Sequence, residues 1–368
     1  MRAAVLREPG LPLEIEDVEL DAPRAGELTV RVEAVGVCHS DLHYMVGDIT
    51  CRLPVVLGHE GAGIVEAPGP RTSGGIAIGA RVAFMWRPHC GRCVACISGN
   101  PVLCASGRVQ ATTGGLLDGT TRLHLGGETL QHFLGVSCLA ERVVISERAV
   151  VPVPDGVPAE IAAITGCAVV TGLGAVLNVV QRAAGRGIVV FGVGGVGLSS
   201  VMGARLVGAD PIVAVDVDGG RLALARRLGA THTVNAGSSD AVEQVRAIAP
   251  DGLDWAIEAV GQAGTLRQAF ASLAPGGTAI ALGLARVGAT FEVPINELVQ
   301  GQKRIVGSLY GSANPLIDLP RIFGLYLSGR LPPDDLIGER FPSRRSTRHT
   351  PNSRWAVSGD RWWCRDDP

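Results

Sequence analysis

One short segment constrains the fold of this chain more than any other, IVVFGVGGVGLSS at residues 188–200. Its pattern predicts a buried strand, a glycine-rich turn and the start of a helix. Gly192, Gly194 and Gly197 occupy the glycine positions of a G-x-G-x-x-G pattern. The first glycine permits a tight turn, the second lets the backbone approach a pyrophosphate, and the third lets helix and strand pack closely. The segment therefore predicts a Rossmann-type dinucleotide-binding domain.

An acidic residue follows at the spacing that such a domain requires. The apolar stretch PIVAVDV predicts a second strand that ends near Asp216, nineteen residues after Gly197. A carboxylate at that point can accept hydrogen bonds from both hydroxyls of the adenosine ribose, and it would repel the 2′-phosphate of NADP. We therefore expect NAD as the coenzyme.

The rest of the chain divides into two regions of different pattern. Up to about Val153, short Val- and Ile-rich runs broken by Gly and Pro predict strands, and from Pro158 onward helices and strands alternate. Alternation of this kind is typical of α/β folds with a doubly wound parallel sheet. We predict a β-rich catalytic domain of residues 1–168 and 310–368, with a coenzyme domain of residues 169–309 inserted in it. Substrate is expected in the cleft between the two domains, near the strand ends of the coenzyme domain.

Composition excludes several classes of function. The 368-residue chain is 46% apolar and carries a formal charge of −2, so it has no overall basic character that favours nucleic acid or a membrane surface. The N-terminal MRAAVLREPG lacks the apolar stretch of a signal peptide, and no run seems to approach the roughly 20 apolar residues of a membrane helix. We expect a soluble, cytoplasmic protein.

Four of the nine cysteines form a compact pattern, C-x-x-C-x-x-C-x7-C, at Cys90, Cys93, Cys96 and Cys104. Four thiolates can close a tetrahedral shell around zinc and leave no position for water, which predicts a structural site. An iron–sulfur cluster is a competing interpretation. A zinc-ribbon module for nucleic acid is another, although the net charge argues against it. A redox switch built on these thiols is a further alternative.

A second set of metal-ligand residues is dispersed along the chain. Cys38 lies in GVCHSDLH, His59 in GHEGAG and Cys167 in TGCAVVTG. Two thiolates and an imidazole would leave a fourth position open, as a catalytic zinc site requires. Spacing alone does not establish that the three residues meet. Cys51, Cys138 and Cys364 have no comparable neighbours, and we interpret them as incidental thiols.

Together these motifs make the chain similar to the zinc-containing medium-chain alcohol dehydrogenases over roughly residues 1–342. GHEGAGIVE resembles the family's catalytic-zinc signature, and the four-cysteine loop and GVGGVG follow in the family's order. DGTTRLHLGGETLQHFLGVS resembles the long form found in animal-type enzymes and in glutathione-linked formaldehyde dehydrogenases. The resemblance implies a GroES-like catalytic domain, two zinc ions per subunit, NAD, and a homodimer formed near GSLYGS.

The resemblance also implies roles for individual residues. Cys38, His59 and Cys167 would hold the catalytic zinc, with Glu60 behind the metal and Asp41 hydrogen-bonded to His59. Ser40 and His43 would form a proton relay that leads from the alcohol through the coenzyme ribose to solvent. The coenzyme would contact His39, Thr171, Gly192, Gly194, Gly195, Val196, Gly197, Asp216 and Arg221. The substrate pocket would include Ile49, Trp86, Phe133 and Leu134.

The function expected from this resemblance is the reversible oxidation of primary or aromatic alcohols to aldehydes, or of secondary alcohols to ketones. A thiol-dependent formaldehyde dehydrogenase is the near alternative. A catalytically impaired binding or structural homologue is an alternative of another class, because residues 343–368 are atypical. They hold three of the five tryptophans and six arginines without helical or strand periodicity. A change of reading frame near Pro342 would produce such a tail, and an authentic disordered tail is the other interpretation. We expect such a tail to weaken NAD binding and to lower stability.

Overall fold

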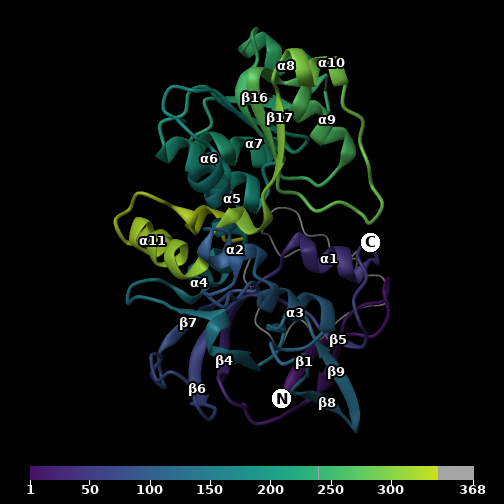
Figure 1. The fold of residues 1–368 in the computed structure, drawn as a ribbon, viewed down its shortest axis with the longest axis vertical. Helices are drawn as coiled ribbons and strands as arrows, with labels where there is room; N and C mark the ends of the chain where they lie inside the picture. The colour runs from purple at the N-terminus through teal and green to yellow at the C-terminus, as the bar shows by residue number, and fades with distance from the viewer. Residues whose placement is uncertain (239, 339–368) are drawn as a thin grey trace. The chain divides into compact units, whose positions relative to one another are not determined.

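A computed structural model describes residues 1–238 and 240–338 of the chain (Figure 1). The atypical segment 343–368 lies outside the described residues. The chain forms two compact units. The first unit contains Met1–Cys167, Asn314–Gly329 and residues 337–338, and the second contains Ala168–Ala313 and Arg330–Leu336. Residues 310–313 and 330–336, which the sequence analysis assigns to the catalytic domain, therefore group with the second unit.

The second unit is built on a six-stranded parallel sheet with the strand order β14-β13-β12-β15-β16-β17. Its first strand is the apolar run of the glycine motif, and every residue of that strand is buried. The order reverses between β12 and β15, and this reversal is where dinucleotides bind in doubly wound sheets. The strands are β12 (Ile188–Phe191), β13 (Ile212–Asp216), β14 (His232–Asn235), β15 (Leu253–Glu258), β16 (Leu273–Ala281) and β17 (Arg304–Gly307).

Helices cover both faces of this sheet. Gly197 of α6 packs over Val190, whereas the neighbouring Val189 and Phe191 point to the opposite face and share a core with Phe270 of α9. The period-two alternation of a strand produces this division. The helices of the second unit are α5 (Val170–Gly174), α6 (Gly195–Leu206), α7 (Gly219–Leu228), α8 (Ala241–Ile248), α9 (Ala263–Ala271) and α10 (Ile295–Gln300), with short turns η4 (Ala175–Val179), η5 (Leu309–Ser312) and η6 (Pro333–Leu336).

The first unit is β-rich and contains two sheets. A five-stranded antiparallel sheet has the order β10-β4-β6-β7-β11, and a six-stranded sheet has the order β2-β1-β5-β9-β8-β3. Alternating apolar residues from the five-stranded sheet, such as Val30, Val82 and Val143, form one core. The strands are β1 (Arg2–Leu6), β2 (Glu14–Asp17), β3 (Glu19–Leu20), β4 (Glu27–Gly36), β5 (Val55–Val56), β6 (Glu60–Pro68), β7 (Arg81–Phe84), β8 (Leu123–Leu125), β9 (Glu128–His132), β10 (Arg142–Ser146) and β11 (Val150–Pro152).

Helices of the first unit are short, except for α11. They are α1 (His39–Met45), α2 (Val94–Ile97), α3 (Ala105–Thr113), α4 (Ala159–Ile164) and α11 (Pro315–Leu327), with the turns η1 (Pro101–Leu103) and η2 (Glu147–Ala149). A π-helical turn, η3 (Thr165–Val169), continues α4 across the boundary between the units. The predicted fold class, a β-rich domain together with a doubly wound parallel sheet, is confirmed.

One expectation from the sequence needs correction. The helical stretch Ala159–Val179 has 21 residues and a mean hydropathy of 1.8, so it is long and apolar enough to cross a membrane. The small residues Ala and Gly made this run look less apolar than it is. In the structure 89% of its 18-residue window is buried inside the protein, which is also typical of a core helix.

A buried ion pair connects the two sheets of the first unit. Arg122, which precedes β8, is 0% exposed and holds the carboxylate of Glu27, the first residue of β4. Its Nη2 lies 2.6 Å from Glu27 Oε1 and its Nε lies 3.0 Å from Oε2, while Asp118 accepts a further bond at 2.7 Å. Nη1 donates to Thr120 Oγ1 and to the Thr121 carbonyl. All donors of the guanidinium group are thereby used, which compensates for its burial.

His132 lies beside this pair and makes the first unit sensitive to acid. Burial, and then the positive charge of Arg122, lower the pKa of His132 to about 3. In the unfolded chain a histidine has a pKa of about 6.5, so the unfolded state takes up a proton first. The neutral buried form contributes its full stability above pH 6.5, and this contribution is lost as the pH falls from about 6.5 toward 3.

We therefore expect the free energy of unfolding to fall between pH 7 and pH 5 by about 2 kcal/mol more in the wild type than in His132→Gln. Urea unfolding curves at both pH values measure this difference. Equal pH dependence in the two proteins would show that His132 is not the group responsible.

Candidate metal and dinucleotide sites

The structure brings the dispersed cysteines and histidine of the first unit together. The ligand atoms of Cys38, His59 and Cys167 all lie within 4.8 Å of one another. Cys167 Sγ is 3.3 Å from His59 Nε2. Cys38 precedes α1, His59 precedes β6, and Cys167 lies in the π turn η3, so three separate elements supply the set.

Asp41 fixes this arrangement from behind. Its side chain is 1% exposed, and its Oδ1 lies 3.3 Å from His59 Nδ1 and accepts the backbone N–H of Gly58 at 3.2 Å. Its other oxygen accepts the backbone N–H of Cys38 at 3.1 Å. One carboxylate therefore orients the imidazole and the start of α1, and it leaves His59 Nε2 directed toward the two sulfur atoms.

The donor set fits zinc. Zinc in proteins binds sulfur at about 2.3 Å and imidazole nitrogen at about 2.0–2.1 Å in tetrahedral geometry, which places neighbouring ligand atoms about 3.5–3.8 Å apart. The observed separations are compatible with that shell. The hydrogen bond with Cys167, and the positive charge of His59, hold the pKa of the Cys38 thiol well below its usual range. A thiolate is the form in which cysteine binds a metal.

Glu60 lies beside this set as a buried carboxylate. It is 1% exposed and stands opposite Gly36 of β4, where a Cβ on Gly36 would come within 2.3 Å of Glu60 Oε2. Glycine at position 36 therefore makes room for the carboxylate. Burial, and then the charges of Asp41 and Glu60, raise the pKa of the nearby Cys138 thiol well above its usual range. Cys138 is accordingly a neutral thiol outside the ligand set.

Residues of the expected relay lie on α1 and its continuation. Ser40 is half-buried, and the side chain of His43 is 15% exposed. His43 Nδ1 lies 3.1 Å from Asp48 Oδ2, a contact that the sequence analysis did not anticipate. His39 is exposed, and its ring meets the His43 ring edge-on at 5.1 Å.

Aromatic side chains surround His59. The Trp86 ring lies 6.2 Å and the Phe133 ring 5.6 Å from the His59 ring, both edge-on. Tyr44, which the sequence analysis did not single out, packs on Phe133 at 4.7 Å. Two of the four expected pocket residues therefore flank the metal-ligand set. Leu134 packs into the apolar cluster around Phe133, and Ile49 is half-buried just after α1, where its N–H bonds the His43 carbonyl.

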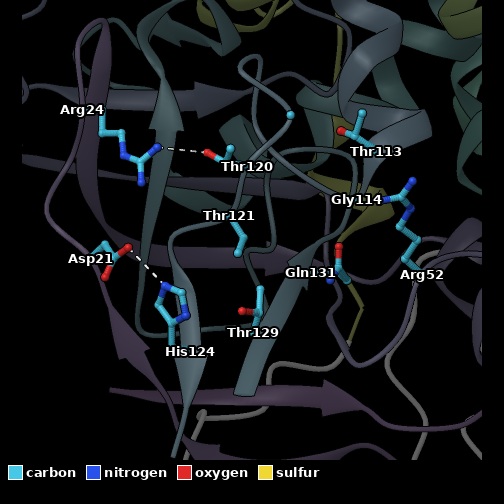
Figure 2. Close-up of a pocket in the computed structure, with 11 residues that line it drawn as sticks. Asp21, Arg24, Arg52, Thr113, Gly114, Thr120, Thr121, His124, Thr129 and Gln131 are labelled. Carbon is cyan, nitrogen blue, oxygen red and sulfur yellow. Dashed lines mark hydrogen bonds and ion pairs between the residues drawn. The ribbon is translucent and has the colours of Figure 1, made fainter. Parts of the chain in front are cut away.

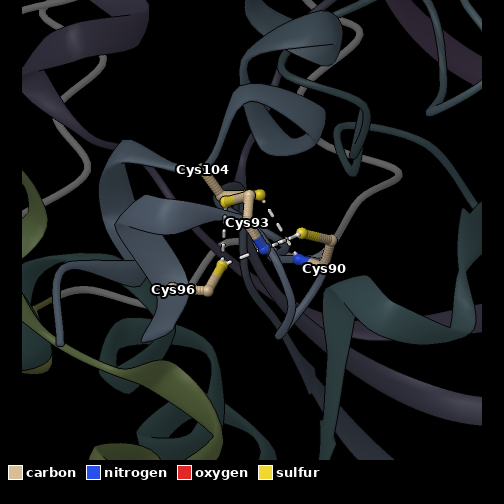
Figure 3. A group of neighbouring side chains, drawn as sticks. All are labelled: Cys90, Cys93, Cys96 and Cys104. Carbon is tan, nitrogen blue, oxygen red and sulfur yellow. Dashed lines mark hydrogen bonds between the residues drawn. The ribbon is translucent and has the colours of Figure 1, made fainter. Parts of the chain in front are cut away.

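The four-cysteine segment also closes on itself, as Figure 3 shows. Its ligand atoms lie within 4.8 Å of one another, with Cys93 Sγ at 3.4 Å and Cys90 Sγ at 3.9 Å from Cys96 Sγ. Backbone N–H groups of Arg92 and Cys93 lower the pKa of the Cys90 thiol to about 6. The separations are compatible with a tetrahedral zinc shell of four sulfur atoms.

In the second unit the glycine turn has the geometry that its sequence predicts. Gly192 has φ of 82°, a conformation that favours glycine, and a Cβ on Gly197 would lie 1.8 Å from the Gly192 carbonyl oxygen. Gly194 is the N-cap of α6, which begins at Gly195. The first turn of α6 therefore presents free backbone N–H groups at the carboxyl end of β12, where phosphates bind.

Asp216 lies at the carboxyl end of the adjacent strand. It is 8% exposed, and its two oxygens accept the N–H groups of Val193 at 2.9 Å and Asp218 at 3.0 Å. Arg221 Nη1 stands 3.8 Å from the same carboxylate. Each carboxylate oxygen can accept a second hydrogen bond. The carboxylate, the glycine turn and Arg221 are thus neighbours.

Thr171 and Val196 come from helices that touch. A Cβ on Gly172, next to Thr171 in α5, would lie 2.0 Å from the Val196 carbonyl oxygen in α6. The two expected coenzyme contacts therefore lie close together beside the turn. Glu258, at the end of β15, was not anticipated. Its Oε1 accepts the N–H groups of Val260 and Gly261 at 2.9 and 2.8 Å and thereby shapes the loop beside Gly192.

A polar hollow of about 320 Å³ lies elsewhere on the first unit, as Figure 2 shows. None of the predicted site residues lines it. Its charged side chains are mostly engaged with one another, since His124 contacts Asp21 at 3.1 Å and Arg24 contacts Thr120 at 3.2 Å. The hollow is lined by Asp21, Arg24, Arg52, Thr113, Gly114, Gly119, Thr120, Thr121, His124, Thr129 and Gln131.

Comparison with known proteins agrees with both units. The model of the alcohol dehydrogenase GroES-like domain matches residues 24–155, and that of the zinc-binding dehydrogenases matches residues 195–322. An NDMA-dependent alcohol dehydrogenase from Amycolatopsis methanolica is 36% identical over 92% of each chain. An S-(hydroxymethyl)glutathione dehydrogenase from Paracoccus denitrificans is 34% identical over 91% of this chain and 92% of its own.

A solved structure agrees as well. Benzyl alcohol dehydrogenase from Acinetobacter calcoaceticus superposes with a TM-score of 0.86 at 33% identity, over 91% of each chain. The GroES-like assignment of the first unit and the resemblance of the whole chain are thereby confirmed. Relatives above 30% identity along nine-tenths of the chain, together with two thiol–metal sets and a glycine turn in the same order, establish its membership. The chain belongs to the zinc-containing medium-chain alcohol dehydrogenase family.

Proposed function

We propose that the protein is a zinc-dependent alcohol dehydrogenase that oxidises primary or aromatic alcohols reversibly with NAD. The observation that carries the proposal is the meeting of Cys38, His59 and Cys167 within 4.8 Å. Zinc held by these three residues supplies Lewis-acid chemistry at an open fourth position. The edge-on rings of Trp86 and Phe133 beside His59 supply an apolar wall suited to an aromatic substrate.

The protein side chains divide the remaining tasks. Asp41 holds His59 so that Nδ1 is used internally and Nε2 is left for the metal. Ser40 receives the hydroxyl proton, and His43 delivers it to solvent. Asp48 stabilises His43 in its charged form through the 3.1 Å contact at Nδ1, which suits a group that carries a proton outward. Cys90, Cys93, Cys96 and Cys104 bind a second, structural zinc.

A direct assay tests this function. Zinc-loaded protein is given a panel of primary, aromatic and secondary alcohols with NAD or NADP, and zinc is counted by elemental analysis. We expect two zinc ions per chain and NAD-linked turnover of a primary or aromatic alcohol. Absence of turnover with every alcohol and coenzyme, in protein that holds both metals, would refute the proposal.

The thiol-dependent reaction is the second candidate. It is favoured by the 34% identity to the S-(hydroxymethyl)glutathione dehydrogenase of Paracoccus denitrificans along 91% of this chain. Rates with formaldehyde in the presence and absence of glutathione or mycothiol separate the two functions. An arm with NDMA is included because one relative is NDMA-dependent.

Coenzyme choice depends on Asp216. In Asp216→Gly we expect the ratio of kcat/KM with NAD to that with NADP to fall about 10- to 100-fold, because the charge-assisted bonds to the ribose disappear together with the repulsion of a 2′-phosphate. Steady-state kinetics with both coenzymes measure the ratio. Asp251→Ala, which removes an exposed carboxylate from the same unit, is the control. An unchanged ratio in Asp216→Gly would show that Asp216 does not read the ribose.

We also propose that the protein forms a homodimer through the second unit. Within the described residues β17 pairs only with β16, so its other edge is open, and the preceding helix α10 exposes Ile295 (76%) and Val299 (66%). An open strand edge beside apolar side chains favours pairing with a second copy. Light scattering on a size-exclusion column tests this, and a monomer at micromolar concentration would contradict it.

A further inference from the structure

Arg87 has a chemical situation that nothing in the proposed reaction explains. It follows Trp86 directly, and its guanidinium carbon lies 5.5 Å from the centre of the Trp86 ring. Two of its nitrogen atoms, Nε and Nη1, are buried and have no hydrogen-bond partner in the described part of the chain. Buried donors without an acceptor are costly, so they indicate an acceptor that the chain itself does not supply.

The charges around Arg87 support the same interpretation. Among residues 1–238 and 240–338 no carboxylate lies within ion-pair distance of its guanidinium group. Burial, and then the positive charge of Arg108, lower its pKa, and the groups that oppose this shift are the thiol of Cys104 and the phenol of Tyr44. Arginine nonetheless remains charged in proteins. Arg87 is therefore a half-buried cation without a matching anion.

Its position relates this cation to the proposed active site. Trp86 stands between His59 and Arg87, with its ring edge-on to the first and in contact with the second. Tyr44 connects the same region to Phe133, whose ring lies 5.6 Å from His59. Moving outward from the metal ligands, one therefore meets an aromatic side chain and then a guanidinium with free donors. An aromatic alcohol with an acidic substituent has the same succession of groups.

We propose that Arg87 is a specificity-determining residue that binds a carboxylate of the substrate, about one aromatic ring away from the reacting hydroxyl. This inference rests on the proposed alcohol dehydrogenase function. The planar guanidinium offers two donors to a carboxylate and discriminates against neutral alcohols of the same size. The carboxylate can belong to the alcohol itself or to a glutathione adduct, and the binding chemistry is the same.

The test compares substrates that differ only in charge. With zinc-loaded wild-type protein we expect a higher kcat/KM for 3- or 4-(hydroxymethyl)benzoate, or for S-(hydroxymethyl)glutathione, than for benzyl alcohol. In Arg87→Met the ratio of the preferred anionic substrate to benzyl alcohol should fall about 10- to 100-fold. Arg87→Lys, which keeps the charge but loses the forked donors, should recover part of the ratio. Whichever anionic substrate loses its advantage identifies the source of the carboxylate.

Arg92→Met is the matched control. Arg92 lies on the same segment but is exposed, so its removal changes the charge without removing buried donors, and the ratio should stay at the wild-type value. A binding measurement separates this inference from the proposed function. Calorimetric titration of zinc-loaded protein with benzoate needs no turnover, and Arg87→Met should bind benzoate about 10- to 100-fold more weakly than the wild type.

Two results would overturn the inference. An equal ratio and equal benzoate affinity in wild type and Arg87→Met would show that no carboxylate binds there. If Arg87→Met instead lost one zinc ion per chain while its substrate ratio stayed unchanged, Arg87 would be a counter-charge for the thiolates that include Cys104. If benzyl alcohol were not oxidised but benzoate bound through Arg87, the anion site would stand and the proposed reaction would fail.

Discussion

Cys167→Ala is expected to retain one zinc ion per chain and to lose alcohol oxidation by about 10³-fold or more. The thiol is one of three ligand atoms that lie within 4.8 Å of one another, so its removal leaves too few donors for the catalytic metal. A bound metal contributes several kcal/mol to stabilising the transition state, and each 1.36 kcal/mol is about a factor of ten in rate. Zinc analysis and steady-state kinetics on the same sample measure both effects.

Cys138→Ala is the matched control for this experiment. Cys138 is equally buried and lies near the same carboxylates, but its raised pKa and its place outside the ligand set predict that both zinc ions remain. Two zinc ions and undiminished turnover in Cys167→Ala would mean that the metal is not held by Cys38, His59 and Cys167.

Arg122→Leu is expected to lower the free energy of unfolding by about 3–5 kcal/mol. The substitution removes one partner of a buried pair and leaves Glu27, which is 6% exposed, with an uncompensated charge. The bonds lost are the two to Glu27 at 2.6 and 3.0 Å and the one to Asp118 at 2.7 Å. Urea or thermal unfolding monitored by circular dichroism measures the change.

Arg24→Leu serves as the comparison for this pair. Arg24 contacts the same Asp118 at 3.5 Å, but its side chain is 57% exposed, and exposed pairs contribute about 0–1 kcal/mol. If both variants lost the same stability, the burial of Arg122 would not be the source of its contribution.

Local chemistry made the coenzyme unit predictable. Gly192, Gly194 and Gly197 are required by backbone conformation and close packing, so their spacing carries information about the turn itself. Asp216 follows because a strand of the expected length must end there. The four-cysteine segment is equally local, since Cys90 and Cys104 are separated by only fourteen positions.

Contacts between distant parts of the chain were not predictable in this way. The Arg122–Glu27 pair joins residues 95 positions apart, and no periodicity in either segment indicates it. Cys167 and His59 are 108 positions apart, and only resemblance to a family suggested that they meet. Arg87 was missed because an arginine in a sequence does not reveal whether its donors find acceptors, which depends on the packing of Trp86 and Tyr44 around it.

The four-cysteine segment has one further consequence for the protein's local order. Its larger apolar side chains point outward, with Val94 78%, Ile97 72% and Leu103 56% exposed, so the loop has little apolar interior to hold it folded. Its conformation is then governed by metal availability, whereas the sheets of the same unit are governed by burial of their aliphatic cores. Depletion of zinc and addition of denaturant therefore act on different parts of one unit, and a cell short of metal would contain molecules with intact sheets and a frayed loop.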